Sequence, residues 1–259
     1  MEEIAQQNKE LVNLQHELEK MEMENGELKN KLAELQREMN QFAYIVSHDL
    51  QTPLRTITGF VELLERKYGD KLDAAAKQYI GFAVNGASRM KKLIFDLLEY
   101  SRLSSVAQEL TDVDLNRVVQ EVKEKLLPMI EQTRAVVTCE QLPVVKADKK
   151  QMEQLFQHLI GNALKFNGTD VPEIKIISKK ENSFWVINVK DNGIGIDPAF
   201  FEKIFIIFRR LYADEVKYSG TGIGLAICKK IIELHAGTIW VESAVDKGSI
   251  FYFTLPAQG

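Results

Sequence analysis

Residues 47–54 read SHDLQTPL and set a histidine beside a carboxylate in a leucine-rich stretch. An imidazole of pKa about 6.5 is mostly neutral at pH 7, so His48 could serve as a nucleophile, a general base or a metal ligand. Asp49 could hold the tautomer that exposes the attacking nitrogen. Thr52 follows one helical turn later on the same face, and Pro53, which lacks a backbone donor, predicts a bendable point. No second cluster of ligand side chains favours a metal, and inert surface is the remaining alternative.

Two glycine-rich stretches further along could approach a ligand. DNGIGID (191–197) follows a strand pattern; its glycines allow a tight turn, and Asp191 could accept a hydrogen bond from an amino group. GTGIGL (220–225) opens a helix, where free backbone N–H groups attract phosphate. Taken alone, the first stretch is equally well a plain β-turn. The second lacks the βαβ repeat and acid of a dinucleotide-binding fold.

A polar residue interrupts the apolar helical stretch HLIGNALKF (158–166). The side-chain oxygen of Asn162 could ligate Mg²⁺, a hard cation that bridges phosphates. An ordinary amide on a helix surface is the alternative, and it would be preferred if the stretch stood alone.

The first 42 residues predict a coiled coil that leads into the histidine. Their apolar residues follow a 3-4 spacing over four heptads, the pattern of a and d positions. Asn25 falls on an a position, where it fixes register and favours a parallel pair. His16 falls outward and is expected to be solvated. The seam consists of Leu11, Leu14, Leu18, Met21, Asn25, Leu28, Leu32, Leu35, Met39 and Phe42.

The seam changes its step just before His48. At 100° per residue, His48 lies about 200° around the helix from the apolar residues two positions before and after it, so it should point away from the seam. A step of four resembles a stutter, which locally unwinds a supercoil. The residues that step by four are Phe42, Val46, Leu50 and Leu54.

A turn signal at Gly69 and Asp70 separates this helix from a second amphipathic one, whose apolar face runs from Ile80 to Ser101. Two helices joined by a short loop form an αα-hairpin, which cannot bury its apolar face alone. Two hairpins from two chains form a four-helix bundle that fits a parallel coiled coil entering it. We therefore predict a homodimer.

Beyond a polar linker at 101–110, strand and helix patterns mix. Helices are expected at 116–132, 149–166 and 222–235. Because the strands lie mostly in hairpins, we predict an α+β sandwich with helices on one face of a mixed sheet. The expected strands occupy 111–115, 135–139, 173–178, 184–191, 237–243 and 249–256.

Composition narrows the classes of protein. The chain has 259 residues, enough for two domains, and its net charge of -4 with no basic block argues against a nucleic-acid surface. No apolar run crosses a bilayer and no signal peptide is present, so we expect a cytoplasmic protein or the soluble part of something larger. Cys139 and Cys228 lack zinc spacing and are expected to be reduced, buried thiols. His235 is expected to be outward and inert.

Taken in order, these motifs are far more specific than any one of them. Over residues 40–256 the chain resembles the sensor histidine kinases of two-component signalling. SHDLQTPL matches the phospho-acceptor box, HLIGNALKF the asparagine box, DNGIGI the first glycine box, IFIIF (204–208) the phenylalanine box and GTGIGL the second glycine box. The stretches SHDLQTPLRTITGF, IFRRLY and AICKKIIELHAGTIWVES look most like the phytochrome-type branch.

The resemblance implies a multi-domain chain. Residues 1–42 would be a parallel coiled-coil signalling helix, 43–104 a dimerisation and histidine phosphotransfer hairpin, and 111–259 the catalytic ATP-binding domain. It also implies ATP and Mg²⁺ as cofactors and the receiver domain of a response regulator as partner. No sensor domain is present, so the sequence is expected to be a truncated or engineered piece of a larger sensor.

The resemblance further implies a role for each matched residue. His48 would be the phospho-acceptor, Asp49 would take or orient its proton, and Thr52 would position a water when the enzyme dephosphorylates its partner. Asn162 would bind Mg²⁺. Asp191 would bond the adenine amino group.

The remaining matches concern the nucleotide pocket. Gly193 and Gly195 would shape it, and residues 209–221 would form a mobile lid over ATP. Lys165 and Arg210 would meet phosphate oxygens. The lid would move and approach the phosphates through Gly220, Gly222 and Gly224, and Thr221 between them is also expected to bind the nucleotide.

One residue departs from the family pattern. The family usually has Asn at the position of His158, four residues before Asn162, and a nitrogen ligand suits Mg²⁺ poorly. We expect slower or differently tuned catalysis rather than none. The alternative function is a catalytically weak, nucleotide-binding dimer that signals by conformation. A purely structural coiled coil explains residues 1–42 and nothing after residue 110.

Overall fold

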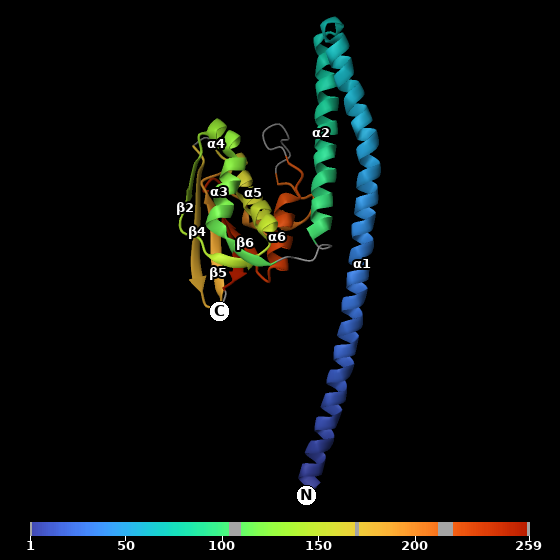
Figure 1. Ribbon diagram of the computed structural model, residues 1–259, viewed down its shortest axis with the longest axis vertical. Coiled ribbons are helices and arrows are strands. Elements are labelled where there is room, and N and C mark those ends of the chain that lie inside the picture. The colour runs from blue at the N-terminus through green and yellow to red at the C-terminus, as the bar shows by residue number, and fades with distance from the viewer. Residues whose placement is uncertain (1, 104–109, 169–170, 212–219, 258–259) are drawn as a thin grey trace.

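The computed structural model describes residues 2–103, 110–168, 171–211 and 220–257. For part of the first helix, His48 included, it describes the backbone alone. A long helical hairpin lies beside an α/β domain, and the N-terminal part of α1 (Glu2–Tyr68) extends well past that domain (Figure 1). Within the described residues, no helix is both long and apolar enough to span a membrane.

The hairpin consists of α1 and α2 (Ala74–Leu103), as predicted. The turn signal becomes a short 3-10 helix, η1 (Gly69–Lys71). Asp73 Oδ1 accepts a hydrogen bond from Ala76 N at 2.7 Å and so caps the start of α2. A small apolar cluster holds the two helices together, and α1 continues through Pro53 as one helix. The cluster contains Leu54, Ala87, Ile94 and Leu98.

The α/β domain has the predicted mixed sheet with helices on one face (Figure 1). Its strand order is β2-β4-β5-β7-β6; β2 runs parallel to β4, and the other neighbours are antiparallel. The strands are β2 (Val136–Cys139), β4 (Glu173–Glu181), β5 (Phe184–Asp191), β6 (Ile239–Ser243) and β7 (Ser249–Pro256). A separate antiparallel pair is formed by β1 (Thr111–Asp114) and β3 (Val144–Ala147).

The helices of this domain are α3 (Leu115–Lys125), α4 (Leu127–Thr133), α5 (Lys149–Lys165) and α6 (Gly224–Leu234). Two short 3-10 helices, η2 (Pro198–Phe200) and η3 (Lys203–Phe205), follow β5. The single helix expected at 116–132 is divided into α3 and α4. Pro128 explains the division, since it cannot donate a backbone hydrogen bond inside a helix and suits a first helical turn.

α5 lies at the centre of the core. Five apolar residues that share one face of this helix are all at most 5% exposed, and Phe156 makes an edge contact with Phe253 of β7, with ring centroids 5.7 Å apart. The five are Met152, Leu155, Phe156, Leu159 and Ala163. The helix that carries Asn162 is therefore fixed by its packing.

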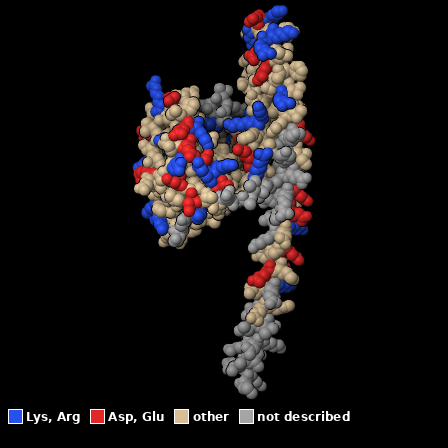
Figure 2. All heavy atoms as spheres, in the orientation of Figure 1, with Lys and Arg blue, Asp and Glu red and all other residues tan. Residues whose placement is uncertain are grey.

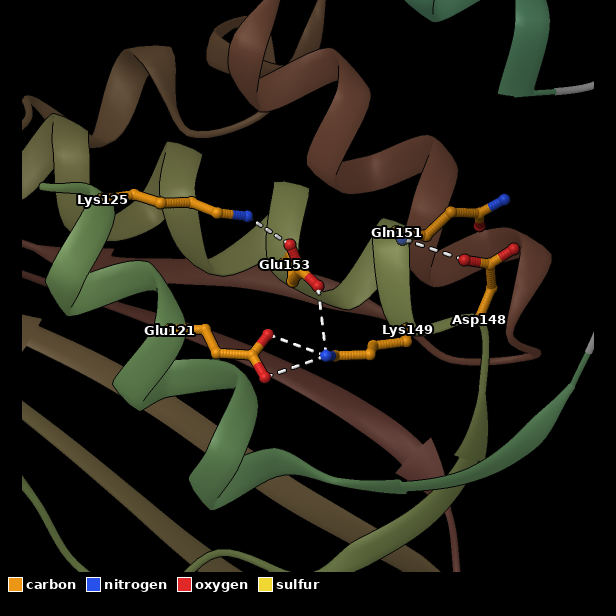
Figure 3. A network of polar contacts seen from close by, with 6 residues as sticks. All are labelled: Glu121, Lys125, Asp148, Lys149, Gln151 and Glu153. Carbon is orange, nitrogen blue, oxygen red and sulfur yellow. Dashed lines mark hydrogen bonds and ion pairs between the residues drawn. The ribbon is translucent and has the colours of Figure 1, made fainter.

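Polar contacts also fix the start of α5 (Figure 3). Asp148 Oδ1 accepts a hydrogen bond from Gln151 N at 3.1 Å, which caps the helix. Lys149 Nζ lies 2.8 Å from Glu121 of α3 and 3.7 Å from Glu153. These contacts join α3 to α5 on the surface of the domain.

Three local expectations were wrong. α2 continues into the predicted linker as far as Leu103, which is buried in the α/β core, and residues 104–109 lie outside the description. Cys139 is exposed at the end of β2, whereas Cys228 is buried as expected. His235 is buried rather than outward: its Nδ1 lies 2.8 Å from Ile231 O, and its Nε2 accepts a hydrogen bond from Asp148 N at 3.0 Å.

Candidate active site

A cleft of about 1650 Å³ runs between the hairpin and the α/β domain. Charged side chains of both signs gather where the two parts meet (Figure 2). Nine of the ten predicted nucleotide-binding residues line this cleft. The tenth, Gly193, lies in the same loop as Gly195, and its N–H donates to Asp191 Oδ1. The nine are Asn162, Lys165, Asp191, Gly195, Arg210, Gly220, Thr221, Gly222 and Gly224.

α5 contributes an amide and a cation to the cleft. Asn162 and Lys165 are both half-buried. The Lys165 ammonium lies 4.3 Å from the centre of the Phe166 ring. Burial, helped by the positive charges of Lys92 and Arg210, lowers the pKa of Lys165 to about 8. A partly desolvated cation among other cations is well placed to bind an anionic group.

Asp191 is the last residue of β5 and lines the cleft. Its Oδ1 accepts hydrogen bonds from Gly193 N at 2.8 Å and from Ser249 N at 3.1 Å. These two bonds hold the carboxyl group in place. Burial raises the pKa of Asp191 to about 6, although the two backbone hydrogen bonds oppose the rise.

The glycines of the first glycine box allow the protein's own backbone to close around Asp191. A Cβ at Gly193 would lie 2.3 Å from Phe166 O. Gly195 has φ +69°, and a Cβ there would lie 1.9 Å from Ala244 O. A side chain at either position would collide with neighbouring backbone. Glycine therefore allows the loop to pass this close to its neighbours and form the pocket wall.

The predicted lid is anchored at both ends, and its middle, residues 212–219, lies outside the described residues. Phe208 N donates to Gly222 O at 3.0 Å, which joins the two ends. Gly222 has φ +75° and lies against Arg209 O, while Phe208 itself has φ +64°. A positive φ at a phenylalanine is strained, and such strain persists only where the surroundings impose it.

His158, the residue that departs from the family pattern, faces the same cleft from α5. Its Nδ1 would lie 3.0 Å from a Cβ at Gly224, so the ring packs on the start of α6. Within the described residues, His158 Nε2 is the buried side-chain polar atom without a hydrogen-bond partner. Burial lowers the pKa of His158, an effect that Asp96 opposes. The lowered pKa favours the neutral imidazole at pH 7, and its unpartnered nitrogen is buried.

Sequence reasoning missed the contact between Thr221 and the hairpin. Thr221 Oγ1 donates a hydrogen bond to Asp96 Oδ2 of α2 at 2.5 Å, and both side chains are buried. One turn later, Gln154 Nε2 of α5 donates to Glu99 Oε2 at 3.2 Å. The only signal in the sequence is that Asp96 and Glu99 interrupt an apolar run, LIFDLLEY.

The predicted phosphotransfer residues follow one another along α1. The side chain of His48 lies outside the described residues. Asp49 is exposed, and Thr52 is exposed on the hairpin wall of the cleft. Thr52 therefore faces the same space as the nucleotide-binding residues of α5.

Two family matches divide the chain as the geometry does. Residues 38–106 match the His Kinase A (phospho-acceptor) domain, and residues 147–259 match the histidine kinase-, DNA gyrase B-, and HSP90-like ATPase. This chain belongs to the sensor histidine kinases. Their phospho-acceptor region is the hairpin, and their ATPase region covers most of the α/β domain.

Similar proteins agree with that family. The chain is 46% identical over 231 residues to the phytochrome-like protein Cph1 of Synechocystis sp., covering 89% of this chain and 31% of the relative. It is 45% identical over 258 residues to cyanobacterial phytochrome A of Nostoc sp., covering 99% of this chain and 32% of the relative. The chain thus spans about a third of the length of these relatives. They support the predicted phytochrome-type branch.

A solved structure has a similar arrangement of both parts. The histidine kinase ThkA, in complex with the response regulator protein TrrA, is 26% identical with a TM-score of 0.60. The match covers 86% of this chain and 64% of the solved chain. The hairpin and the α/β domain therefore follow the architecture of a histidine kinase.

Proposed function

We propose that this chain is an ATP-dependent protein-histidine kinase that phosphorylates its own His48. The observation that carries the proposal is the shared cleft, in which Thr52 of the hairpin faces the residues expected to bind ATP. A donor site and an acceptor helix that line one cleft can be brought together by a movement of one part against the other, and positioning supplies much of the catalysis of phosphoryl transfer. Three parts would share the work: residues 1–42, 43–104 and 111–259.

The nucleotide would lie across the α/β domain. Asp191 would accept a hydrogen bond from the adenine amino group, in a pocket shaped by Gly193 and Gly195. Lys165 and Arg210 would bind phosphate oxygens. The loop formed by Gly220, Thr221, Gly222 and Gly224 would close on the phosphate groups.

The site suits Mg²⁺ through its oxygen donors. Asn162 lines the cleft beside Lys165, and its side-chain oxygen is the hard ligand that Mg²⁺ prefers. Among the described residues, no group of three or more His, Cys, Asp or Glu side chains is arranged to hold a metal. Mg²⁺ would therefore be held by Asn162 together with the phosphates, and it would neutralise their charge.

The hairpin residues would act at the acceptor. His48 would attack through its neutral imidazole, and Asp49 would hold the ring and stabilise the departing proton. The phosphoryl group would then pass to an aspartate of a response regulator. Thr52 would position a water for dephosphorylation of that partner.

The working form would be a homodimer in the cytoplasm, where ATP is available, downstream of a sensor domain. Four residues of the predicted coiled-coil seam are more than half exposed in the single chain, which leaves an apolar stripe for a second copy. They are Leu18, Met21, Leu28 and Leu35.

One observation favours the alternative of a catalytically weak dimer that signals by conformation. His158 replaces an amide with a ring that packs on Gly224. If that ring displaced the metal and its waters, nucleotide would bind without efficient transfer.

A labelling experiment separates the two functions. The chain is incubated with γ-labelled ATP and Mg²⁺, and a receiver domain is then added. The kinase proposal expects acid-labile label on the chain. After the receiver domain is added, this label should move to the receiver as an acyl phosphate on an aspartate. Nucleotide binding without any label on the chain would contradict it and favour the conformational dimer.

A further inference from the structure

A buried acid on α2 faces the α/β domain rather than the hairpin core. Ile94 packs within the hairpin, and Asp96, two residues later, points about 200° away from it around the helix. Asp96 is 8% exposed. Among the described side chains of the hairpin, it is the only charged one that is buried. Nearby Leu97 and Tyr100 pack against the α/β core, so this face of α2 is a contact surface between the two parts.

The contact of Asp96 falls on the second glycine box. Thr221 Oγ1 donates to Asp96 Oδ2 at 2.5 Å across 125 positions of sequence, and Thr221 is 7% exposed. A hydroxyl has one proton and donates to one acceptor at a time. While Asp96 accepts that proton, Thr221 cannot donate to another anion.

The surroundings of Thr221 favour an anion. A Cβ at the preceding Gly220 would lie 2.7 Å from Lys165 Nζ, so the ammonium reaches this loop. Lys92, one turn before Asp96 on α2, acts electrostatically on Lys165 and on His158. The loop therefore gathers positive charge, and Asp96 is the negative group that the hairpin supplies to it.

We propose that the Asp96 carboxylate competes with the phosphate groups of the nucleotide for Thr221, so that nucleotide binding and docking of the hairpin on the glycine loop oppose each other. The inference rests on the proposed function, since it requires a nucleotide in this loop. Two anions repel each other strongly in a partly desolvated site and cannot share one donor. Such coupling is reciprocal. A movement of α2 that withdraws Asp96 raises the affinity for nucleotide, and bound nucleotide weakens docking of the hairpin on the glycine loop by the same factor. A signal arriving through the hairpin thereby reaches the nucleotide site.

Calorimetric titration of the full chain with a non-hydrolysable ATP analogue and Mg²⁺ tests the inference. Asp96→Asn keeps the shape of the side chain and removes its charge, and Asp96→Ala removes the acceptor. Asp70→Asn is the matched control, because it removes an exposed acid from η1 at the far tip of the hairpin (Figure 1). We expect both Asp96 variants to bind the analogue at least five-fold more tightly than the parent, and Asp70→Asn to bind like the parent.

The outcomes separate the inference from the proposed function. A cooperative unfolding transition shows that an Asp96 variant is folded. If such a variant binds the ATP analogue with the parent's affinity or more weakly, the inference is overturned, while the binding of the analogue by the parent still stands. If Asp96→Asn fails to fold, Asp96→Ala decides by the same criterion, and Asp96→Ser replaces it should both fail. A parent chain that binds no nucleotide overturns the proposed function and the inference together.

Discussion

At the scale of single residues, the site depends on ionisable side chains whose charged forms are destabilised by burial. Asp191 is buried with a pKa raised to about 6, and Lys165 is half-buried with a pKa lowered to about 8. Each shift opposes the charge that the proposed chemistry needs. A ligand that pairs with these groups would recover that cost, which is typical of sites that perturb pKa values for function.

The first prediction concerns the pH dependence of nucleotide binding through Asp191. Its raised pKa means that the folded, unliganded protein takes up a proton as pH falls through about 6. The protonated carboxyl is a poorer acceptor for an amino group, so affinity for an ATP analogue should fall between pH 7 and pH 5. Asp191→Asn should bind about 10- to 100-fold more weakly, as expected for loss of a hydrogen bond to a charged group.

The same titration on Asp191→Asn serves as the control, because protonation of the nucleotide itself affects both proteins. The parent should lose more affinity than the variant over this range. Parallel pH curves for the two proteins would show that Asp191 does not bind the base.

The second prediction concerns Gly195. Gly195→Ala places a Cβ 1.9 Å from Ala244 O at a positive φ, so the loop must move. We expect the free energy of unfolding of the α/β domain to fall by about 2 kcal/mol or more, since backbone strain and steric overlap add. Gly161→Ala is the control, because nothing lies within 4 Å of a Cβ there, and within α5 it should stabilise by about 1 kcal/mol. Urea unfolding of both variants measures the difference, and equal stabilities would contradict the close approach.

At the scale of secondary-structure elements, α1 connects the predicted coiled coil to the cleft. It continues through Pro53 as a single helix, although proline cannot donate a hydrogen bond to the carbonyl four residues earlier, at Asp49. The missing bond lies beside His48, within reach of the cleft wall at Thr52. This makes the segment a candidate point of bending for signals that travel along α1.

The third prediction follows from that missing bond. Pro53→Ala restores a backbone donor and should make α1 stiffer and the chain more stable, by about 1 to 3 kcal/mol. The ratio of autophosphorylation to dephosphorylation of the partner should change with it. Both rates are measured on one preparation of each protein. An unchanged ratio in a stabilised variant would exclude a hinge at this position.

The sequence predicted the elements better than the contacts between them. The buried face of α5 follows from the spacing of Met152 and its apolar companions, and the antiparallel pairing of β4 with β5 follows from two alternating runs. The boundary between α3 and α4 was missed, because one helix was expected at 116–132, although Pro128 in the sequence marks the division. The burial of His235 depends on Asp148, 87 positions away, and no local pattern reports such a contact.

In the candidate site too, the local motifs could be predicted from the sequence, whereas the contacts between distant segments could not. Its motifs were readable because each glycine box is local in sequence, and all but Gly193 of the predicted nucleotide-binding residues line one cleft. The Asp96–Thr221 hydrogen bond joins the hairpin to the second glycine box and depends on how the two parts pack together. Composition and periodicity describe single elements and carry no information on that packing.

At the scale of the whole molecule, the exposed seam of α1 predicts assembly. Two chains of 29.5 kDa should sediment as a particle of about 59 kDa, twice the chain mass. Leu28→Glu places a charge in the seam and should weaken the dimer. His16→Glu changes an exposed, outward position and should not. Analytical ultracentrifugation compares the three proteins, and a parent that stays monomeric at micromolar concentration would contradict the dimer.

The identity of the phospho-acceptor is the central claim, and one labelling experiment tests it most directly. The parent, His48→Ala and His16→Ala are each incubated with γ-labelled ATP and Mg²⁺. His16 lies in the same helix and is exposed, so it controls for the loss of a histidine from α1. The account predicts acid-labile label on the parent and on His16→Ala and none on His48→Ala. Label that survives in His48→Ala would contradict it.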